Sequence, residues 1–346
     1  MRKMKALIAY GSQDLRLETM DIPAYEDDEV LIRVKACGIC GSDLPRALQG
    51  TAHSYPIILG HEFSGYVAAV GSSVTNIQAG QRVTAAPLLP CGSCQYCKIG
   101  RPAMCESYNF VGSRRPGAFA EYVAIKAINV VPLADEVDYP AGAMIEPISV
   151  ALHGVGRVSF NAGATAAVFG AGTIGLLTLQ CLKAQGAGKV YVVDVIGTKL
   201  RLAQQLGADA VINALEDDPV DYMKQQGQPA VVFETAGSPL TQRQSIEVVS
   251  KLGKVVFVGT ATKELGLPPH SFEKILRGEI EVTGSWMSYS APYPGYEWPA
   301  VALYIKEGKI KTDPLITHKF KLEDGINAFR TMVDKDADAI KVMFVM

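Results

Sequence analysis

The sequence predicts an α/β protein of two domains, and three observations point to this fold class. From about residue 153, short apolar runs alternate with helical stretches, which is the pattern of a sheet built from strand–helix–strand units. A glycine-rich turn of the type that binds dinucleotides lies near the start of this region. The first 35 residues instead carry short apolar runs broken by an acidic, proline-containing segment, which is typical of β-structure. A chain of 346 residues is long enough for two cores.

The second half is expected to form a doubly wound parallel sheet of six strands. These strands are expected at 166–170, 190–194, 210–213, 231–235, 254–260 and 280–285. Helical stretches separate most of them, so the connections are crossovers and the strands run parallel. Ser238 followed by Pro239 has the form of a helix N-cap with proline at the first helical position.

The turn after the first of these strands predicts a dinucleotide site. Gly170, Gly172 and Gly175 have the spacing G-x-G-x-x-G. The first glycine permits the tight turn, the second lets the backbone approach a pyrophosphate, and the third lets the helix pack against the strand. The first turn of that helix, at Thr173 and Ile174, offers its N–H groups to the phosphates. Glycines also serve as turn and cap residues, but the flanking strand and helix favour the nucleotide interpretation.

Asp194 ends the next strand, about twenty residues further on. A carboxylate in this place accepts hydrogen bonds from the ribose hydroxyls of NAD and repels the 2′-phosphate of NADP. No arginine follows at once to hold such a phosphate. NAD is therefore the expected cofactor.

Four cysteines form the clearest metal signal. Cys91, Cys94, Cys97 and Cys105 have the spacing C-x2-C-x2-C-x7-C, and four thiolates a few residues apart can enclose one tetrahedral ion. The spacing disfavours four unrelated buried cysteines. Zinc is expected, with an iron centre as the alternative. Four thiolates leave no position for a substrate, so this site should be structural.

A second metal site, open to substrate, is indicated by a thiol, an imidazole and a carboxyl group. Cys40, His61 and Glu146 each lie in a segment flanked by glycine or proline, and such a set holds zinc while leaving one position open. Glu62 is a fourth candidate, able to take or vacate the open position. A lone His61 would more often be a packed core residue, and Cys37 is interpreted as a bystander.

The composition excludes several classes of partner. The net charge is −2 and no basic run occurs, so nucleic acids and anionic membranes are not expected as partners. No apolar run reaches membrane-spanning length, and the N-terminal apolar run is too short for a signal sequence. Seven cysteines, an odd number, indicate thiols or metal ligands in a reducing cytoplasm rather than disulfides.

Several of these motifs occur together in the order of one known family. They are Gly38-Ile-Cys-Gly-Ser-Asp43, Gly60-His-Glu62, the four-cysteine lobe, Glu146-Pro147 and the glycine turn. Over essentially its whole length the chain resembles the zinc-dependent medium-chain alcohol and polyol dehydrogenases. The resemblance implies a GroES-like β-barrel catalytic domain over 1–152, completed by 287–346, and a Rossmann NAD-binding domain over 153–286.

The resemblance also implies site roles. Cys40 and His61 would hold a catalytic zinc together with Glu146 or Glu62, and Asp43 would be the partner of His61. Two zinc ions per chain and a homo-oligomer, a dimer or a tetramer, are then expected.

The expected reaction follows from these parts. Zinc would act as a Lewis acid on the substrate hydroxyl, and hydride would pass to a nicotinamide held against 284–286. The proton would leave through Ser42 or Glu62. Many relatives place a histidine five residues after the zinc cysteine as the end of a proton relay, whereas this chain has Pro45 there.

The resemblance is strongest to family members whose substrate is a polyol phosphate. Arg46, Arg114 and Arg115 are the candidates to bind the phosphate, because a dianion in a partly dry site must be paired. Each could equally be a solvated surface residue. Dehydrogenases of an unphosphorylated alcohol, such as sorbitol, butanediol or threonine, are the nearest alternatives.

Two further alternatives stand apart from these. A zinc-free reductase of the same fold should lack Cys40, His61 and the cysteine lobe. A non-enzymatic NAD- or zinc-binding module would not need an open metal site.

Overall fold

The computed structural model describes residues 2–261 and 263–346 and divides the chain into two compact units. Unit 1 comprises the residues up to Glu146, Tyr289–Glu307 and Thr312–Met346, and unit 2 comprises Pro147–Ser288 and Gly308–Lys311. The sequence predicts the first boundary slightly later, after residue 152. The difference arises because one continuous helix, α4 (Ile145–Gly156), crosses it.

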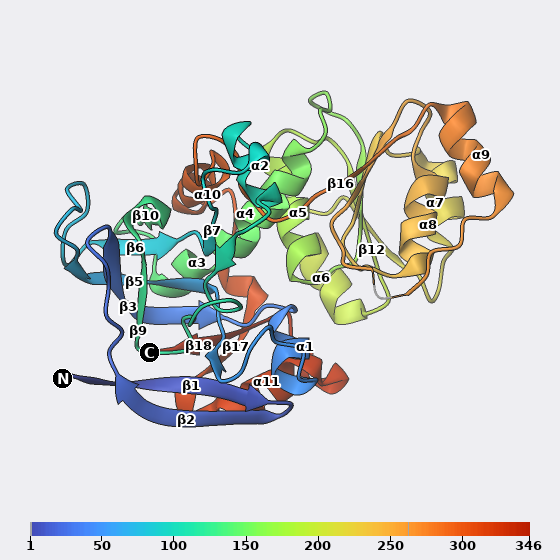
Figure 1. Cartoon of the computed structure of the whole chain (residues 1–346). Coiled ribbons are helices and arrows are strands. Elements are labelled where there is room, and N and C mark those ends of the chain that lie inside the picture. The colour runs from blue at the N-terminus through green and yellow to red at the C-terminus, as the bar shows by residue number, and fades with distance from the viewer. Residues whose placement is uncertain (1, 262) are drawn as a thin grey trace. The chain divides into compact units, whose positions relative to one another are not determined.

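Unit 1 is mainly β-structure, and its largest sheet has seven strands (Figure 1). Their order is β10-β6-β5-β3-β18-β17, and β9 also pairs with β3. All pairs are antiparallel except β17 with β18. The bounds are β3 (Glu29–Gly38), β5 (Glu62–Val70), β6 (Arg82–Ala85), β9 (Tyr122–Lys126), β10 (Val130–Pro132), β17 (Ile316–Phe320) and β18 (Lys341–Val345).

Smaller elements complete unit 1. A three-stranded sheet and a two-stranded sheet contain β1 (Lys3–Gly11), β2 (Asp14–Asp21), β4 (Ile57–Ile58), β7 (Leu88–Leu89) and β8 (Asn109–Phe110). The α-helices are α1 (Asp43–Leu48), α2 (Gln95–Lys98), α3 (Tyr139–Ala143), α10 (Glu297–Lys306) and α11 (Gly325–Val333). Short 3₁₀ turns occur at Pro102–Met104, Ala127–Asn129, Asp313–Leu315, Leu322–Asp324 and Lys335–Ala337.

The core of unit 1 fixes the backbone just before His61. The rings of Phe119 and Phe344 meet edge to face with centroids 5.0 Å apart, and Phe119 is fully buried. Gly60 has φ of 93°, and a Cβ added there would lie 2.5 Å from the Phe119 ring. Only glycine accepts both the conformation and the contact, so this packing sets the direction in which the chain presents His61.

Unit 2 confirms the parallel sheet expected from the sequence. Its six strands run in the order β13-β12-β11-β14-β15-β16, and every pair is parallel. The strands are β11 (Ala166–Phe169), β12 (Val190–Asp194), β13 (Ala210–Asn213), β14 (Val231–Glu234), β15 (Lys254–Phe257) and β16 (Glu281–Gly284). The helices are α5 (Thr173–Ala184), α6 (Gly197–Gln205), α7 (Pro219–Gln226), α8 (Pro239–Val248) and α9 (Pro269–Gly278). No helix in the described part of the chain is long and apolar enough to cross a bilayer.

Candidate metal and nucleotide sites

The loop between β3 and α1 carries Cys40, and Asp43 holds this loop in shape. Asp43 is fully buried at the start of α1, and its Oδ2 accepts a hydrogen bond of 3.1 Å from the backbone N–H of Cys40. The N–H of Ser42 points at the Cys40 sulfur, 3.5 Å away. These two contacts fix the position of the Cys40 sulfur at the start of α1.

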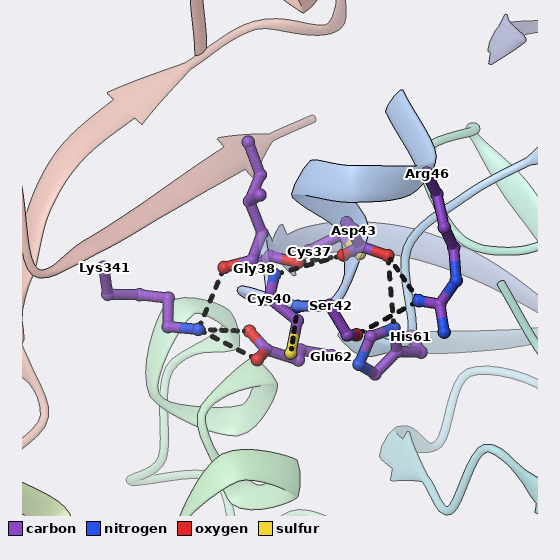
Figure 2. A network of polar contacts seen from close by, with 10 residues as sticks. Cys37, Gly38, Cys40, Ser42, Asp43, Arg46, His61, Glu62 and Lys341 are labelled. Atoms are coloured by element: carbon purple, nitrogen blue, oxygen red, sulfur yellow. Dashed lines mark hydrogen bonds and ion pairs between the residues drawn. The ribbon is translucent and has the colours of Figure 1, made fainter. Parts of the chain in front are cut away.

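His61 lies beside this loop and is buried. Its Nδ1 is 3.6 Å from Oδ1 of Asp43 (Figure 2), and neither atom has a hydrogen-bond partner among the residues that the structure describes. Burial lowers the pKa of His61, but the interactions with Asp43 and Cys40 together outweigh it, and the pKa is raised well above its usual value. Asp43 is therefore placed to orient the imidazole and favour its cationic or metal-bound form.

Glu62 begins β5 and is paired with a residue that sequence reasoning did not identify. Lys341, on β18, donates to both carboxylate oxygens of Glu62, at 2.9 and 2.6 Å, and to the carbonyl of Ile39 at 3.1 Å. A Cβ added to Gly38 would lie 2.2 Å from Oε2 of Glu62. Glycine at position 38 thus leaves the space that the carboxylate occupies. The available signal was a lysine at the head of an otherwise apolar strand.

Cys40, His61 and Glu62 come together as a candidate metal-binding group. Their ligand atoms all lie within 4.8 Å of one another. A thiolate, an imidazole and a carboxylate are ligands that zinc accepts, and three of them leave a coordination position open. The donor set fits the expected catalytic zinc.

Glu146 is close to this group but is not part of it. It is buried at the start of α4, and burial raises its pKa to about 7, although the charge of His61 opposes this. The charge of Glu62 also raises the pKa of Glu146, and the charge of Lys341 lowers it. The structure therefore gathers Glu62 with Cys40 and His61, and keeps Glu146 nearby as a second carboxyl group.

The arginines singled out for a substrate phosphate have different surroundings. Arg46 on α1 donates from Nη1 to Oγ of Ser42 at 3.1 Å and lies 3.5 Å from Oδ1 of Asp43 (Figure 2). Arg114 is exposed and stacks over the ring of Tyr108. Arg115 instead pairs with Glu29 at 3.2 Å and donates to the carbonyl of Ala124. Its guanidinium therefore connects segments of unit 1.

The four cysteines of the lobe also form one group. Their sulfur atoms lie within 4.8 Å of one another. Backbone N–H groups of Cys91 and Cys94 point at the sulfurs of Cys105 and Cys91, at 3.2 and 3.3 Å. Hydrogen bonds from Ser93 lower the pKa of Cys91 to about 6. Four sulfur donors gathered in this way fit a closed tetrahedral zinc site.

The glycine turn has the geometry that a dinucleotide requires. Gly170 has φ of 96°, and a Cβ added to Gly175 would lie 1.8 Å from the Gly170 carbonyl oxygen. A Cβ added to Gly172, which caps α5, would meet no atom within 4 Å. The turn is thus tightly packed on its inner side and open at Gly172, where a pyrophosphate would lie.

Asp194 is tied to this turn by hydrogen bonds. Its Oδ2 accepts from the N–H of Ala171 at 2.6 Å, and its Oδ1 accepts from the N–H groups of Val195 and Ile196 at 2.8 and 2.9 Å. The carboxylate is therefore fixed beside the glycine turn, as a residue that selects between ribose substituents must be.

A second loop, which follows β14, is hydrogen-bonded to the glycine turn. The sequence did not predict this contact. Thr235 donates from Oγ1 to the carbonyls of Phe169 and Gly170, at 2.8 and 3.2 Å. Glu234 accepts at Oε1 from the N–H groups of Ala236 and Gly237. Sequence reasoning noted this segment only as the end of a strand and an N-cap.

Comparison with known proteins places these sites in a family context. Residues 26–135 match the family of alcohol dehydrogenase GroES-like domains, and residues 173–303 match the zinc-binding dehydrogenases. Both matches confirm the expected fold class. The chain is 39% identical to galactitol 1-phosphate 5-dehydrogenase of Escherichia coli (strain K12), covering 99% of this chain and 100% of that one. It is 34% identical to sorbitol dehydrogenase of Bacillus subtilis (strain 168), covering 99% and 97%.

Two solved structures have a fold similar to that of this chain. The crystal structure of galactitol-1-phosphate dehydrogenase from Escherichia coli superposes with a TM-score of 0.94, over 99% of this chain and 100% of that chain at 39% identity. A zinc-binding dehydrogenase from Sinorhizobium meliloti 1021, bound to NADP, superposes with a TM-score of 0.92 over 100% of both chains at 31% identity.

Proposed function

The chain belongs to the zinc-dependent alcohol dehydrogenase family, and from this premise we propose that it oxidises a secondary alcohol of a sugar-alcohol phosphate with NAD. The proposed reaction converts galactitol 1-phosphate to tagatose 6-phosphate. The observation that carries the dehydrogenase assignment is the convergence of Cys40, His61 and Glu62 within 4.8 Å. The phosphorylated substrate is supported by the full-length identity of 39% to the Escherichia coli enzyme.

The roles of the protein groups follow from their contacts. Cys40, His61 and Glu62 would hold the catalytic zinc, with Glu146 able to replace Glu62. Bound zinc supplies a Lewis acid that makes the substrate hydroxyl more acidic. Ser42, which is exposed next to Cys40, would receive the hydroxyl proton. Asp43 keeps His61 in one orientation, and Lys341 holds the Glu62 carboxylate.

The cofactor site is proposed to bind NAD rather than NADP. The N–H groups at the start of α5 would face the pyrophosphate. Asp194, held by three backbone N–H groups, would accept from the adenosine ribose and repel a 2′-phosphate. A second zinc in the four-cysteine lobe would be structural.

An unphosphorylated polyol is the second candidate substrate, favoured by the 34% identity to sorbitol dehydrogenase of Bacillus subtilis. A non-enzymatic zinc- and NAD-binding module is the candidate of a different class. Against it stands the mixed donor set at Cys40, since a purely structural ion is better held by a closed shell like that of the cysteine lobe.

Initial rates distinguish these possibilities. The zinc-loaded protein is assayed with NAD and NADP on galactitol 1-phosphate, galactitol and sorbitol. We expect the highest kcat/KM for galactitol 1-phosphate with NAD. A higher value for a free polyol overturns the phosphorylated substrate, and no turnover of any alcohol by protein containing two zinc ions overturns the enzymatic assignment.

A further inference from the structure

We propose that Arg46, Arg114 and His53 form a subsite in unit 1 that binds the phosphate group of the substrate. The inference rests on the proposed function, because it concerns the part of the substrate that a free polyol lacks. The three residues come from α1, from the turn after β8 and from the loop before β4.

Arg46 is held next to the metal-binding group without belonging to it. Its Nη1 contacts Ser42 and Asp43, and Asp43 in turn approaches His61 (Figure 2). The side chain is only 21% exposed. The contacts of this guanidinium with described residues engage Nη1, so the donors of Nε and Nη2 remain for an anion. A partly dry guanidinium of this kind binds a phosphate more strongly than a solvated one.

Arg114 approaches the same region from another segment. Its turn is closed by the N–H of Arg114 donating to the carbonyl of Phe110 at 3.0 Å. The ring of Phe110 packs edge-on against His61, with centroids 5.5 Å apart. The turn that carries Arg114 is therefore fixed against a metal ligand. Stacking over Tyr108, with the guanidinium carbon 4.5 Å from the ring centroid, orients the side chain and leaves its N–H donors in the plane of the guanidinium.

His53 lies in a loop that folds back onto α1. The hydroxyl of Tyr55 donates to the carbonyl of Arg46 at 2.5 Å and accepts from the N–H of Ala52 at 3.2 Å. These two bonds connect Ala52 and Tyr55, which flank His53, to Arg46. Burial lowers the pKa of His53, and the charges of Arg114 and Arg46 lower it further. Arg46 is also connected to the turn of Arg114 through His61, which lies 3.6 Å from Asp43 and packs against the ring of Phe110.

The grouping has the chemistry of a phosphate site. Two guanidinium groups and an imidazole repel one another when charged, and an anion bound between them removes that cost. Arginine presents paired donors that match the oxygens of a phosphate, and a neutral imidazole adds one N–H donor. In galactitol 1-phosphate the phosphate is several carbons from the reacting hydroxyl. A phosphate site should therefore lie beside the metal ligands and not on them, as these residues do.

The test compares substrate preference in four variants. Arg46→Gln, Arg114→Gln and His53→Gln each remove one donor group, and Arg115→Gln is the matched control because Arg115 is paired with Glu29. The readout is the ratio of kcat/KM for galactitol 1-phosphate to that for galactitol. This ratio cancels any loss that falls on both substrates, which matters for Arg46 because it contacts Ser42 and Asp43.

We expect the ratio to fall roughly ten- to a hundred-fold in the two arginine variants and up to about ten-fold in His53→Gln, as for the loss of a hydrogen bond to a charged group. Arg115→Gln should keep the wild-type ratio. Calorimetric titration of the zinc-loaded protein with galactitol 1-phosphate should show the same order of affinities. Equal efficiency of the wild type on both polyols overturns the proposed phosphorylated substrate. A wild-type preference that survives in Arg46→Gln and Arg114→Gln overturns the subsite alone.

Discussion

Nζ of Lys341 lies 2.6 Å from Oε2 of Glu62, although the two residues are 279 positions apart in the sequence. Both side chains are 2% exposed. β18 lies next to β3, and β3 lies next to β5, so neighbouring strands bring the pair together. A buried carboxylate of the proposed metal site is therefore paired with a cation that the protein itself supplies.

Removing the positive charge of Lys341 should lower the free energy of unfolding. In Lys341→Met the charge of Glu62 is left buried without its partner, and loss of one member of a buried pair typically lowers stability by about 3–5 kcal/mol. Denaturant unfolding of protein from which a chelator has removed the catalytic zinc measures this, because a bound zinc ion would itself pair with Glu62. The double variant Lys341→Met/Glu62→Gln should recover part of the loss, because no uncompensated charge remains. A single-variant loss below about 1 kcal/mol contradicts the importance of the pair.

Chelation should separate the two proposed zinc sites. The four-cysteine lobe would enclose an ion with four sulfur donors, whereas the Cys40 group would supply three ligands and leave a position open. A chelator should remove about one zinc ion per chain and abolish activity while circular dichroism stays unchanged. The second ion should leave only under harsher treatment. Simultaneous loss of activity and fold at every chelator concentration speaks against this division.

Asp194 should determine the choice of cofactor. In Asp194→Ser the charge that repels a 2′-phosphate is gone, so KM for NAD should rise roughly ten-fold or more and the gap to NADP should narrow. Asp194→Asn is the matched control, because it keeps an acceptor for the N–H of Ala171 but loses the charge. A wild-type protein that already uses NADP as well as NAD would disprove the assigned role.

Thr235 should affect nucleotide affinity without touching the nucleotide. Thr235→Val removes the side-chain hydrogen bonds to the carbonyls of Phe169 and Gly170. The Phe169 carbonyl still accepts from the backbone N–H of residue 235, so the loss falls on the Gly170 carbonyl, and an unsatisfied buried acceptor costs about 1–3 kcal/mol. NADH should bind roughly ten-fold more weakly by fluorescence titration, with zinc content unchanged. Thr235→Ser keeps the hydroxyl and should bind like the wild type. Equal affinity of the valine variant would show that the turn is held by other contacts.

Local patterns predicted most of the fold of unit 2. All six strands occur within three residues of the expected ends, since each is a short apolar run flanked by turn or helix signals. Ser238 caps α8, as its sequence context indicates. Metal-ligand spacing likewise identified the four cysteines that the structure gathers into one group.

Contacts between distant segments could not be predicted in this way. The residues around Lys341 in the sequence do not indicate that it pairs with Glu62. Likewise, the residues around Arg115 do not indicate that it pairs with Glu29. The sequence also could not decide whether Glu62 or Glu146 joins Cys40 and His61. That depends on which carboxylate the folding of unit 1 brings close to them.

The position of β18 has a consequence for the growing polypeptide. The ribosome makes β3 and β5, with Cys40 and Glu62, before residues 147–288 of unit 2, and makes Lys341 only after them. During that interval the nascent barrel holds a carboxylate whose counter-charge has not yet been synthesised. Domains tend to fold as units while the chain emerges, so the nucleotide-binding unit is free to fold first. Maturation of the catalytic centre then depends on the late arrival of one strand.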